Sequence, residues 1–147
     1  FRDRICKEVG RELPGEEIDQ IWNAMLKDIP DYKFELLLKL QENYKLYLLS
    51  NTNDLHWEHC ADKFVYKGMQ MLGCFTRVFL SYQMHLAKPD AEIFRTVLKE
   101  AGIKAEETLF VDDSKDNCQA ASLLGIKVFH YVPGDNLEIQ LQNFISK

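Results

Sequence analysis

The chain has 147 residues, of which 46% are hydrophobic and 28% charged, enough apolar material for one globular core and a small appendage. Its formal net charge is -5, with both signs interspersed, so the chain lacks the basic surface expected of a nucleic-acid binder. No apolar run approaches the roughly 20 residues of a membrane-spanning helix, so the composition argues against nucleic acid and membrane as partners.

The four cysteines, Cys6, Cys60, Cys74 and Cys118, lie far apart and form no CxxC pair. This spacing is typical of reduced thiols rather than of a disulfide framework or a zinc site. We therefore expect a cytoplasmic protein with free thiols.

The first 30 residues show helical periodicity. Ile5, Val9 and Leu13 fall on one stripe, and a second stripe covers residues 18–29 after a Pro-Gly break. Two short amphipathic helices are predicted there. A third is predicted over residues 32–43, where phenylalanine and leucines form a broad apolar face.

Four short apolar runs that end in polar residues predict β-strands. They cover residues 44–49, 78–81, 108–111 and 127–131, and the first reads as a buried strand. Helical patterns separate them, notably one at 91–101, closed by a glycine. Strands alternating with helices of this length indicate βαβ crossovers and a parallel sheet, so the predicted fold class is α/β. In such folds functional residues lie at the carboxyl ends of the strands.

Two adjacent carboxylates, Asp112 and Asp113, follow the third predicted strand. Burying both is costly unless a cation or hydrogen-bond donors compensate their charge. Carboxylate oxygens suit magnesium, a hard cation that takes one or two carboxylates together with substrate phosphate. The alternative is that one of them caps the helix beginning near Ser114, which leaves the other unexplained.

Three further residues stand where they can meet a phosphate. Ser50 and Asn51 end the first predicted strand and offer a hydroxyl, an amide and backbone N–H groups, although both types are also common in turns. Lys88, followed by proline, precedes the helix at 91–101 and directs a compact positive charge at the strand ends. Most lysines are solvated surface groups. Lys88 becomes a candidate site residue only through its spacing from the other two motifs.

Taken together, residues 48–53, 87–94 and 109–114, with Asn117 following, resemble motifs two, three and four of the haloacid dehalogenase (HAD) superfamily in order and spacing. The chain looks closest to the subclass with a small helical cap, which includes sugar-phosphate phosphatases and the amino-terminal phosphatase domain of soluble epoxide hydrolases. The resemblance implies a three-layer, Rossmann-like parallel-sheet core, the HAD fold, with a partial α-helical cap.

The resemblance also implies magnesium-dependent hydrolysis of a small phosphorylated metabolite, with sugar phosphates the leading class, through an aspartyl-phosphate intermediate. At the matching positions Ser50 would hydrogen-bond the phosphoryl oxygens with Asn51 beside it, and Lys88 would neutralise phosphate and nucleophile charge. Asp113 matches the metal-binding acid. Asp112, also assigned to the metal site, takes a position often held by glycine. It is expected to lie behind the residues that bind the metal directly, or to assist them through a water molecule.

The family's first motif, an apolar strand ending in DxDx[TV], has no counterpart in the sequence. We therefore interpret residues 1–30 as a remnant of the cap and residues 31–147 as a core lacking its first strand. We expect roughly fifty residues, a strand and a few helices, to precede Phe1 and to carry the nucleophilic aspartate. Two alternatives are a non-catalytic domain that binds phosphate and magnesium, and a haloacid dehalogenase-like enzyme, against which the paired acids and the magnesium requirement argue.

Overall fold

A computed structural model of the chain describes residues 2–12, 14–16, 18, 28–134 and 136–145. Its helices are α1 (Arg2–Val9), α3 (Asp31–Gln41), α4 (Asp54–Lys63), α5 (Ser81–Met84), α6 (Ala91–Ala101), α7 (Lys115–Ser122) and α8 (Leu137–Ile145), with short 3-10 turns η1 (Met71–Cys74) and η2 (Ala105–Glu107). Its strands are β1 (Leu46–Ser50), β2 (Val65–Tyr66), β3 (Met69–Gln70), β4 (Phe75–Leu80), β5 (Leu109–Asp112) and β6 (Lys127–His130).

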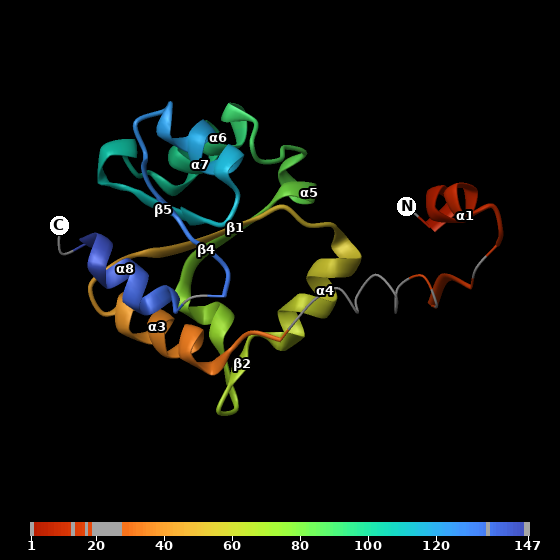
Figure 1. Cartoon of the computed structure of the whole chain (residues 1–147), viewed down its shortest axis with the longest axis horizontal. Coiled ribbons are helices and arrows are strands. Elements are labelled where there is room, and N and C mark those ends of the chain that lie inside the picture. Colours follow the sequence, from red (N-terminus) through yellow and green to blue (C-terminus); the bar gives the residue numbers. More distant parts are fainter. Residues whose placement is uncertain (1, 13, 17, 19–27, 135, 146–147) are drawn as a thin grey trace.

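The elements form three layers. Helices α6 and α7 lie on one side of the strands and α3 and α8 on the other, while α1 stands apart from this body (Figure 1). Strand β1 pairs with β4, and β5 with β6, both in parallel. The arrangement confirms the α/β class predicted from the alternation of strands and helices.

Helix α6 shows how the local sequence produces an element. The Asp90 side chain accepts a hydrogen bond from the backbone N–H of Glu92 at the first turn, and Gly102 ends the helix in the left-handed region at φ 65°. Between these ends Ile93 and Phe94 are buried. They pack with residues of α7 and of the turn that follows it, so α6 closes one face of the core.

The predicted boundaries agree with these elements within a few residues. Helix α6 has the predicted bounds, and β4 begins at Phe75 rather than at residue 78. The second predicted helix of the opening segment lies mostly outside the described residues. No helix in the described ranges is both long and apolar enough to cross a membrane.

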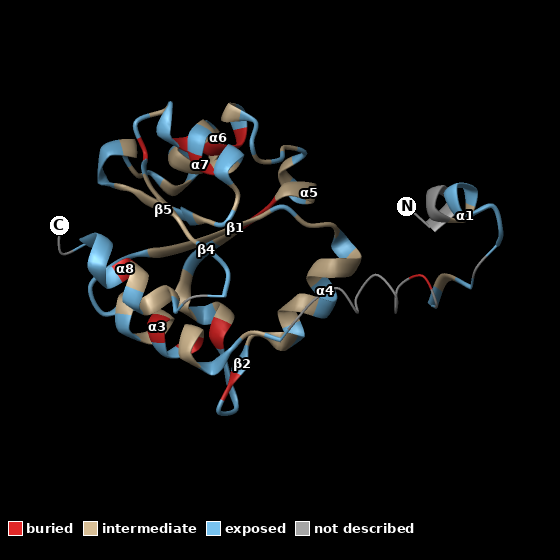
Figure 2. Cartoon of the chain, viewed as in Figure 1, coloured by how far each residue is buried: buried red, intermediate tan, exposed pale blue. Residues whose placement is uncertain are grey.

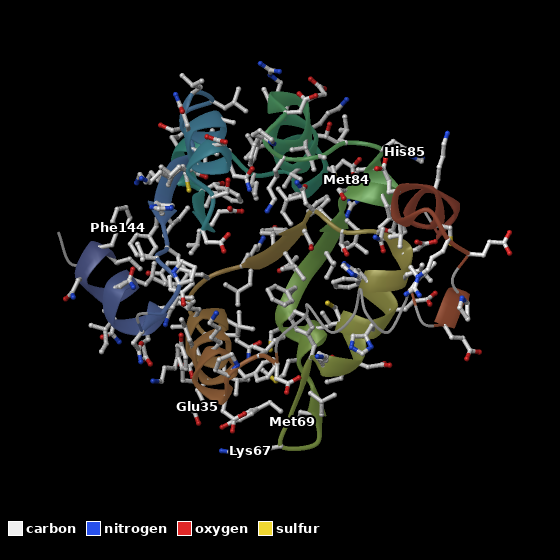
Figure 3. The ribbon with its side chains drawn as sticks, turned by 45° about the vertical axis from the view of Figure 1, so that its right-hand side comes forward. Glu35, Lys67, Met69, Met84, His85 and Phe144 are labelled. Carbon is white, nitrogen blue, oxygen red and sulfur yellow. The ribbon has the colours of Figure 1, made fainter. Side chains whose placement is uncertain are left out.

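A hairpin formed by β2 and β3 was not predicted, because strands of two residues are too short to show a period. It turns at Lys67 and Gly68, both with positive φ. The buried Tyr66 anchors it, since its hydroxyl donates to Glu35 Oε1 on α3 at 2.5 Å. Figure 3 shows Glu35 near the hairpin residues Lys67 and Met69.

The burial of the strands differs from the prediction. No residue of β1 is fully buried, as its intermediate colour in Figure 2 shows, and Val111 of β5 is 37% exposed. Among the described residues β1 and β5 are each hydrogen-bonded along one edge, so the chain has two separate parallel strand pairs instead of one continuous sheet. A strand without a neighbour on one edge leaves part of its surface to solvent.

Candidate active site

The carboxyl ends of β1 and β5 meet at the side chain of Lys88. Its Nζ donates to Asp112 Oδ2 at 2.7 Å and to the backbone carbonyl of Leu49 at 3.1 Å. The Lys88 and Asp112 side chains are each 9% exposed. One lysine therefore links the carboxyl ends of β1 and β5, which belong to different strand pairs.

Three donors surround the carboxylate of Asp112. Besides Lys88 on Oδ2, its Oδ1 accepts from the backbone N–H of Ser114 and from Asn117 Nδ2, both at 2.9 Å. Burial raises the pKa of Asp112, but these hydrogen bonds and the lysine charge lower it more, so the pKa lies below its ordinary value of 3.8. Asp112 is thus a carboxylate at neutral pH whose negative charge holds Lys88 in place.

The alternative that an aspartate caps α7 is not what the structure shows. Ser114 is the N-cap residue, and its side chain accepts a hydrogen bond from the backbone N–H of Asn117. In the fourth motif of the family that the sequence resembles, an acid often occupies the position of Asn117. In this chain its amide acts instead as a donor to Asp112.

Asp113 differs from Asp112 in being exposed to solvent. In the part of the chain that the structure describes, its carboxylate makes no hydrogen bond or ion pair. Its backbone carbonyl lies 3.0 Å from His130 Nε2, so the imidazole must donate through that nitrogen. Sequence reasoning missed His130, because a predicted parallel sheet does not say which strands pair. The observed pairing of β5 with β6 sets Asp112 opposite His130.

The loop after β1 is hydrogen-bonded to the loop at Lys88 and to Ser81, the first residue of α5. Asn51 Oδ1 accepts from the backbone N–H of Lys88 at 2.9 Å, and Asn51 Nδ2 donates to the Lys88 carbonyl at 2.8 Å. Ser81 Oγ similarly accepts from the N–H of Thr52 and donates to its carbonyl, both at 2.9 Å. Ser50 ends β1 beside Asn51 and is half-buried.

The predicted site residues thus fall into two groups. Asn51, Lys88 and Asp112 are connected by hydrogen bonds. Ser50 and Asp113 are next to these residues in sequence, but in the described part of the chain their side chains form no hydrogen bond with them. No cluster of three or more histidine, cysteine, aspartate or glutamate side chains suited to a metal occurs among the described residues. The exposed Asp113 offers one hard oxygen donor, which fits magnesium when phosphate and water complete its shell.

Charged residues at the carboxyl ends of parallel strands that are flanked by helices are typical of ligand sites in Rossmann-like α/β folds. Residues 4–125 match the profile of the haloacid dehalogenase-like hydrolases. The chain belongs to this family, and the resemblance found in its motifs is confirmed.

Known relatives agree with this assignment. The chain is similar to D-ribitol-5-phosphate phosphatase of Bacteroides thetaiotaomicron, with 35% identity over 131 residues, 88% of this chain and 63% of that protein. A solved HAD family enzyme of the same organism, in complex with magnesium and inorganic phosphate, is 44% identical with a TM-score of 0.89 over 95% of this chain and 71% of that one. A HAD-like hydrolase from Porphyromonas gingivalis is 30% identical, with a TM-score of 0.86 over 100% of this chain and 72% of its own. The fold is therefore the HAD fold, and the chain spans 63% of the curated relative.

Proposed function

We propose that the chain is the greater part of a magnesium-dependent phosphatase that hydrolyses a small phosphate ester, a sugar phosphate or sugar-alcohol phosphate. The observation that carries this proposal is the Lys88–Asp112 pair at the meeting point of β1 and β5. The pair supports the proposal because it holds a cation at the strand ends, where a phosphoryl group would bind. The similarity to a ribitol-phosphate phosphatase supports the substrate class.

In this proposal the residues of the chain divide the work of phosphoryl transfer. Lys88 neutralises negative charge on the phosphoryl oxygens, and Ser50 donates a hydrogen bond to them. Asp113 supplies a carboxylate to the metal, and Asp112 holds the lysine charged and oriented. Magnesium, when bound, offsets the charge on the transferring group and helps to align it.

The nucleophilic aspartate is proposed to come from a segment outside these 147 residues. The open edges of β1 and β5 support this, because unpaired N–H and C=O groups along a strand are a template for a further strand. A strand inserted between them, in parallel, would end beside Lys88 Nζ, which touches both flanking strands. Its terminal aspartate would then face the lysine, and a covalent aspartyl-phosphate would form there.

The division of the chain follows the same proposal. Residues 31–147 are assigned to the core and residues 1–30 to a helical cap. Helix α3 supports the boundary, because it packs against α8 and η1 of the core. A cytoplasmic location is proposed as well, since Cys60, Cys74 and Cys118 are free thiols in the structure.

The first test measures phosphate release from p-nitrophenyl phosphate and from a panel of sugar and sugar-alcohol phosphates, including D-ribitol 5-phosphate, with and without magnesium. This chain is compared with a protein extended upstream. We expect activity only in the extended protein and only with magnesium. Asp113→Asn and Lys88→Ala should abolish it, while the matched surface changes Asp116→Asn and Lys104→Ala should not.

The same assay separates the two alternatives. An extended protein that releases halide from a 2-haloacid without magnesium and leaves all phosphate esters intact would be a dehalogenase. A protein that binds magnesium and inorganic phosphate but turns over nothing in either form would be a binding domain. Either result would overturn the phosphatase proposal.

A further inference from the structure

The side-chain amide of Asn51 holds a single residue, Lys88, by both of its backbone polar groups. The backbone N–H of Lys88 donates to Asn51 Oδ1 at 2.9 Å, and Asn51 Nδ2 donates to the Lys88 carbonyl at 2.8 Å. A backbone N–H can only donate and a carbonyl can only accept, so this pairing sets which end of the amide is oxygen. We call these two hydrogen bonds the amide clamp.

The clamp acts on a residue whose side chain is long and flexible. A lysine ammonium on its four-carbon stem has many accessible positions, and its place in a site depends on where its backbone is held. In Lys88 the Nζ reaches the Leu49 carbonyl at 3.1 Å and Asp112 Oδ2 at 2.7 Å. The clamp holds the start of that stem, and the two acceptors hold its end.

Asn51 itself stands on a loop that is tied down. Both backbone polar groups of its neighbour Thr52 are hydrogen-bonded to Oγ of Ser81, the residue that directly follows β4. The position of Asn51 is therefore set from two strands, β1 before it and β4 beside it. A positioning group must itself be supported in this way, because an amide on a mobile loop cannot restrict its partner.

We propose that Asn51 is a positioning residue that acts through Lys88, and that its amide orients the lysine rather than contacting phosphate. The inference rests on the proposed phosphatase function and assigns a role within that site. It leaves contact with the phosphoryl group to Ser50 and Lys88. The role is distinct from direct substrate binding, which the motif position alone would imply for Asn51.

The first test of the clamp uses NMR to measure the rate of hydrogen exchange at the Lys88 backbone amide in the upstream-extended protein. Asn51→Ala should expose this N–H and speed its exchange, whereas Asn51→Asp should keep it protected, because a carboxylate oxygen still accepts from it. The matched control is Asn53→Ala, which removes an amide that caps α4 through the N–H of His56. Unchanged exchange at Lys88 in Asn51→Ala, with the fold intact by circular dichroism, would overturn the clamp.

The functional role is tested by a double-mutant cycle with inorganic phosphate as the probe, in the presence of magnesium. Asn51→Ala should weaken phosphate binding roughly tenfold when Lys88 is present and by less than about twofold in a Lys88→Met background, because the two residues act as one unit. Asn53→Ala should leave the affinity unchanged in both backgrounds. An equal loss in both backgrounds would mean that Asn51 contacts phosphate directly, and the inference would be wrong.

The two tests also separate this inference from the proposed function. If the unsubstituted protein binds no phosphate, the proposed function fails, and with it the role of Asn51 in that site. The exchange experiment still decides then whether the amide orients Lys88. If phosphate binds and the cycle shows no coupling, the positioning role alone is overturned.

Discussion

Lys88 Nζ and Asp112 Oδ2 form an ion pair of 2.7 Å that links two strand pairs with no ladder hydrogen bonds between them in the described chain. Each side chain is 9% exposed, so both charges have lost most of their hydration. Such a pair is stable only when its geometry is good and the remaining polar atoms have partners. Here Ser114 and Asn117 supply further donors to the carboxylate.

Removing the lysine should destabilise the protein more than the loss of an ordinary surface pair. Lys88→Met leaves the Asp112 carboxylate buried without its counter-charge, and we expect a loss of about 3 kcal/mol in the free energy of unfolding. The measurement is urea denaturation. The control is Lys104→Met, whose pair with Glu107 has side chains 67% and 65% exposed and should change stability by less than about 1 kcal/mol. Equal losses in the two variants would contradict the prediction.

Stability should fall in acid partly through Asp112. Its pKa is lower in the folded protein than the ordinary 3.8, so between these two values the unfolded chain binds the proton and the folded chain does not. The contribution of Asp112 is therefore fully present above the unfolded pKa and is lost as pH falls through the folded pKa. Unfolding free energies measured from about pH 6 downward should show a weaker pH dependence in Asp112→Asn than in the unsubstituted protein. Parallel pH profiles would refute this.

The core between α6 and α7 should be sensitive to the size of Ile93. This residue is 0% exposed and packs with Phe94, Ala121 and Ile126. Ile93→Ala removes buried methyl and methylene groups and leaves a cavity, which should cost about 2 to 5 kcal/mol in thermal or urea unfolding. The matched control is Leu123, which directly follows α7 and is 81% exposed. Its change to alanine should cost less than about 0.5 kcal/mol.

The thiol of Cys118 should be unreactive in the folded protein. It is buried on α7, and burial, together with the nearby Asp112 charge, raises the pKa of the thiol above its ordinary value. Only the thiolate reacts with iodoacetamide, so alkylation at mildly alkaline pH should modify Cys118 far more slowly than the half-buried Cys74. Peptide mass spectrometry locates the label, and comparable labelling of both residues before denaturation would contradict the structure.

Several parts of the fold were accessible from residue patterns because their causes are local. The apolar spacing and the Gly102 stop predict α6 without any tertiary information. The short hairpin at β2 and β3 carries no such periodic signal, and it exists because Tyr66 reaches the core and Glu35. The burial of β1 could not be predicted either, since a strand's exposure depends on what pairs with its second edge.

The candidate site divides in the same way. Residue type and spacing predicted the candidate residues, because parallel strands bring their carboxyl ends to one edge. These residues are Ser50, Asn51, Lys88, Asp112 and Asp113. Their pairing was decided by the tertiary structure: Asn51 clamps Lys88 from 37 residues away, and Asn117 and Lys88 both donate to Asp112. Hydrogen bonds depend on distances of a few tenths of an ångström between side chains of separate elements. The sequence therefore identifies the polar side chains of the candidate site, but only the packed fold determines which of them form hydrogen bonds with one another.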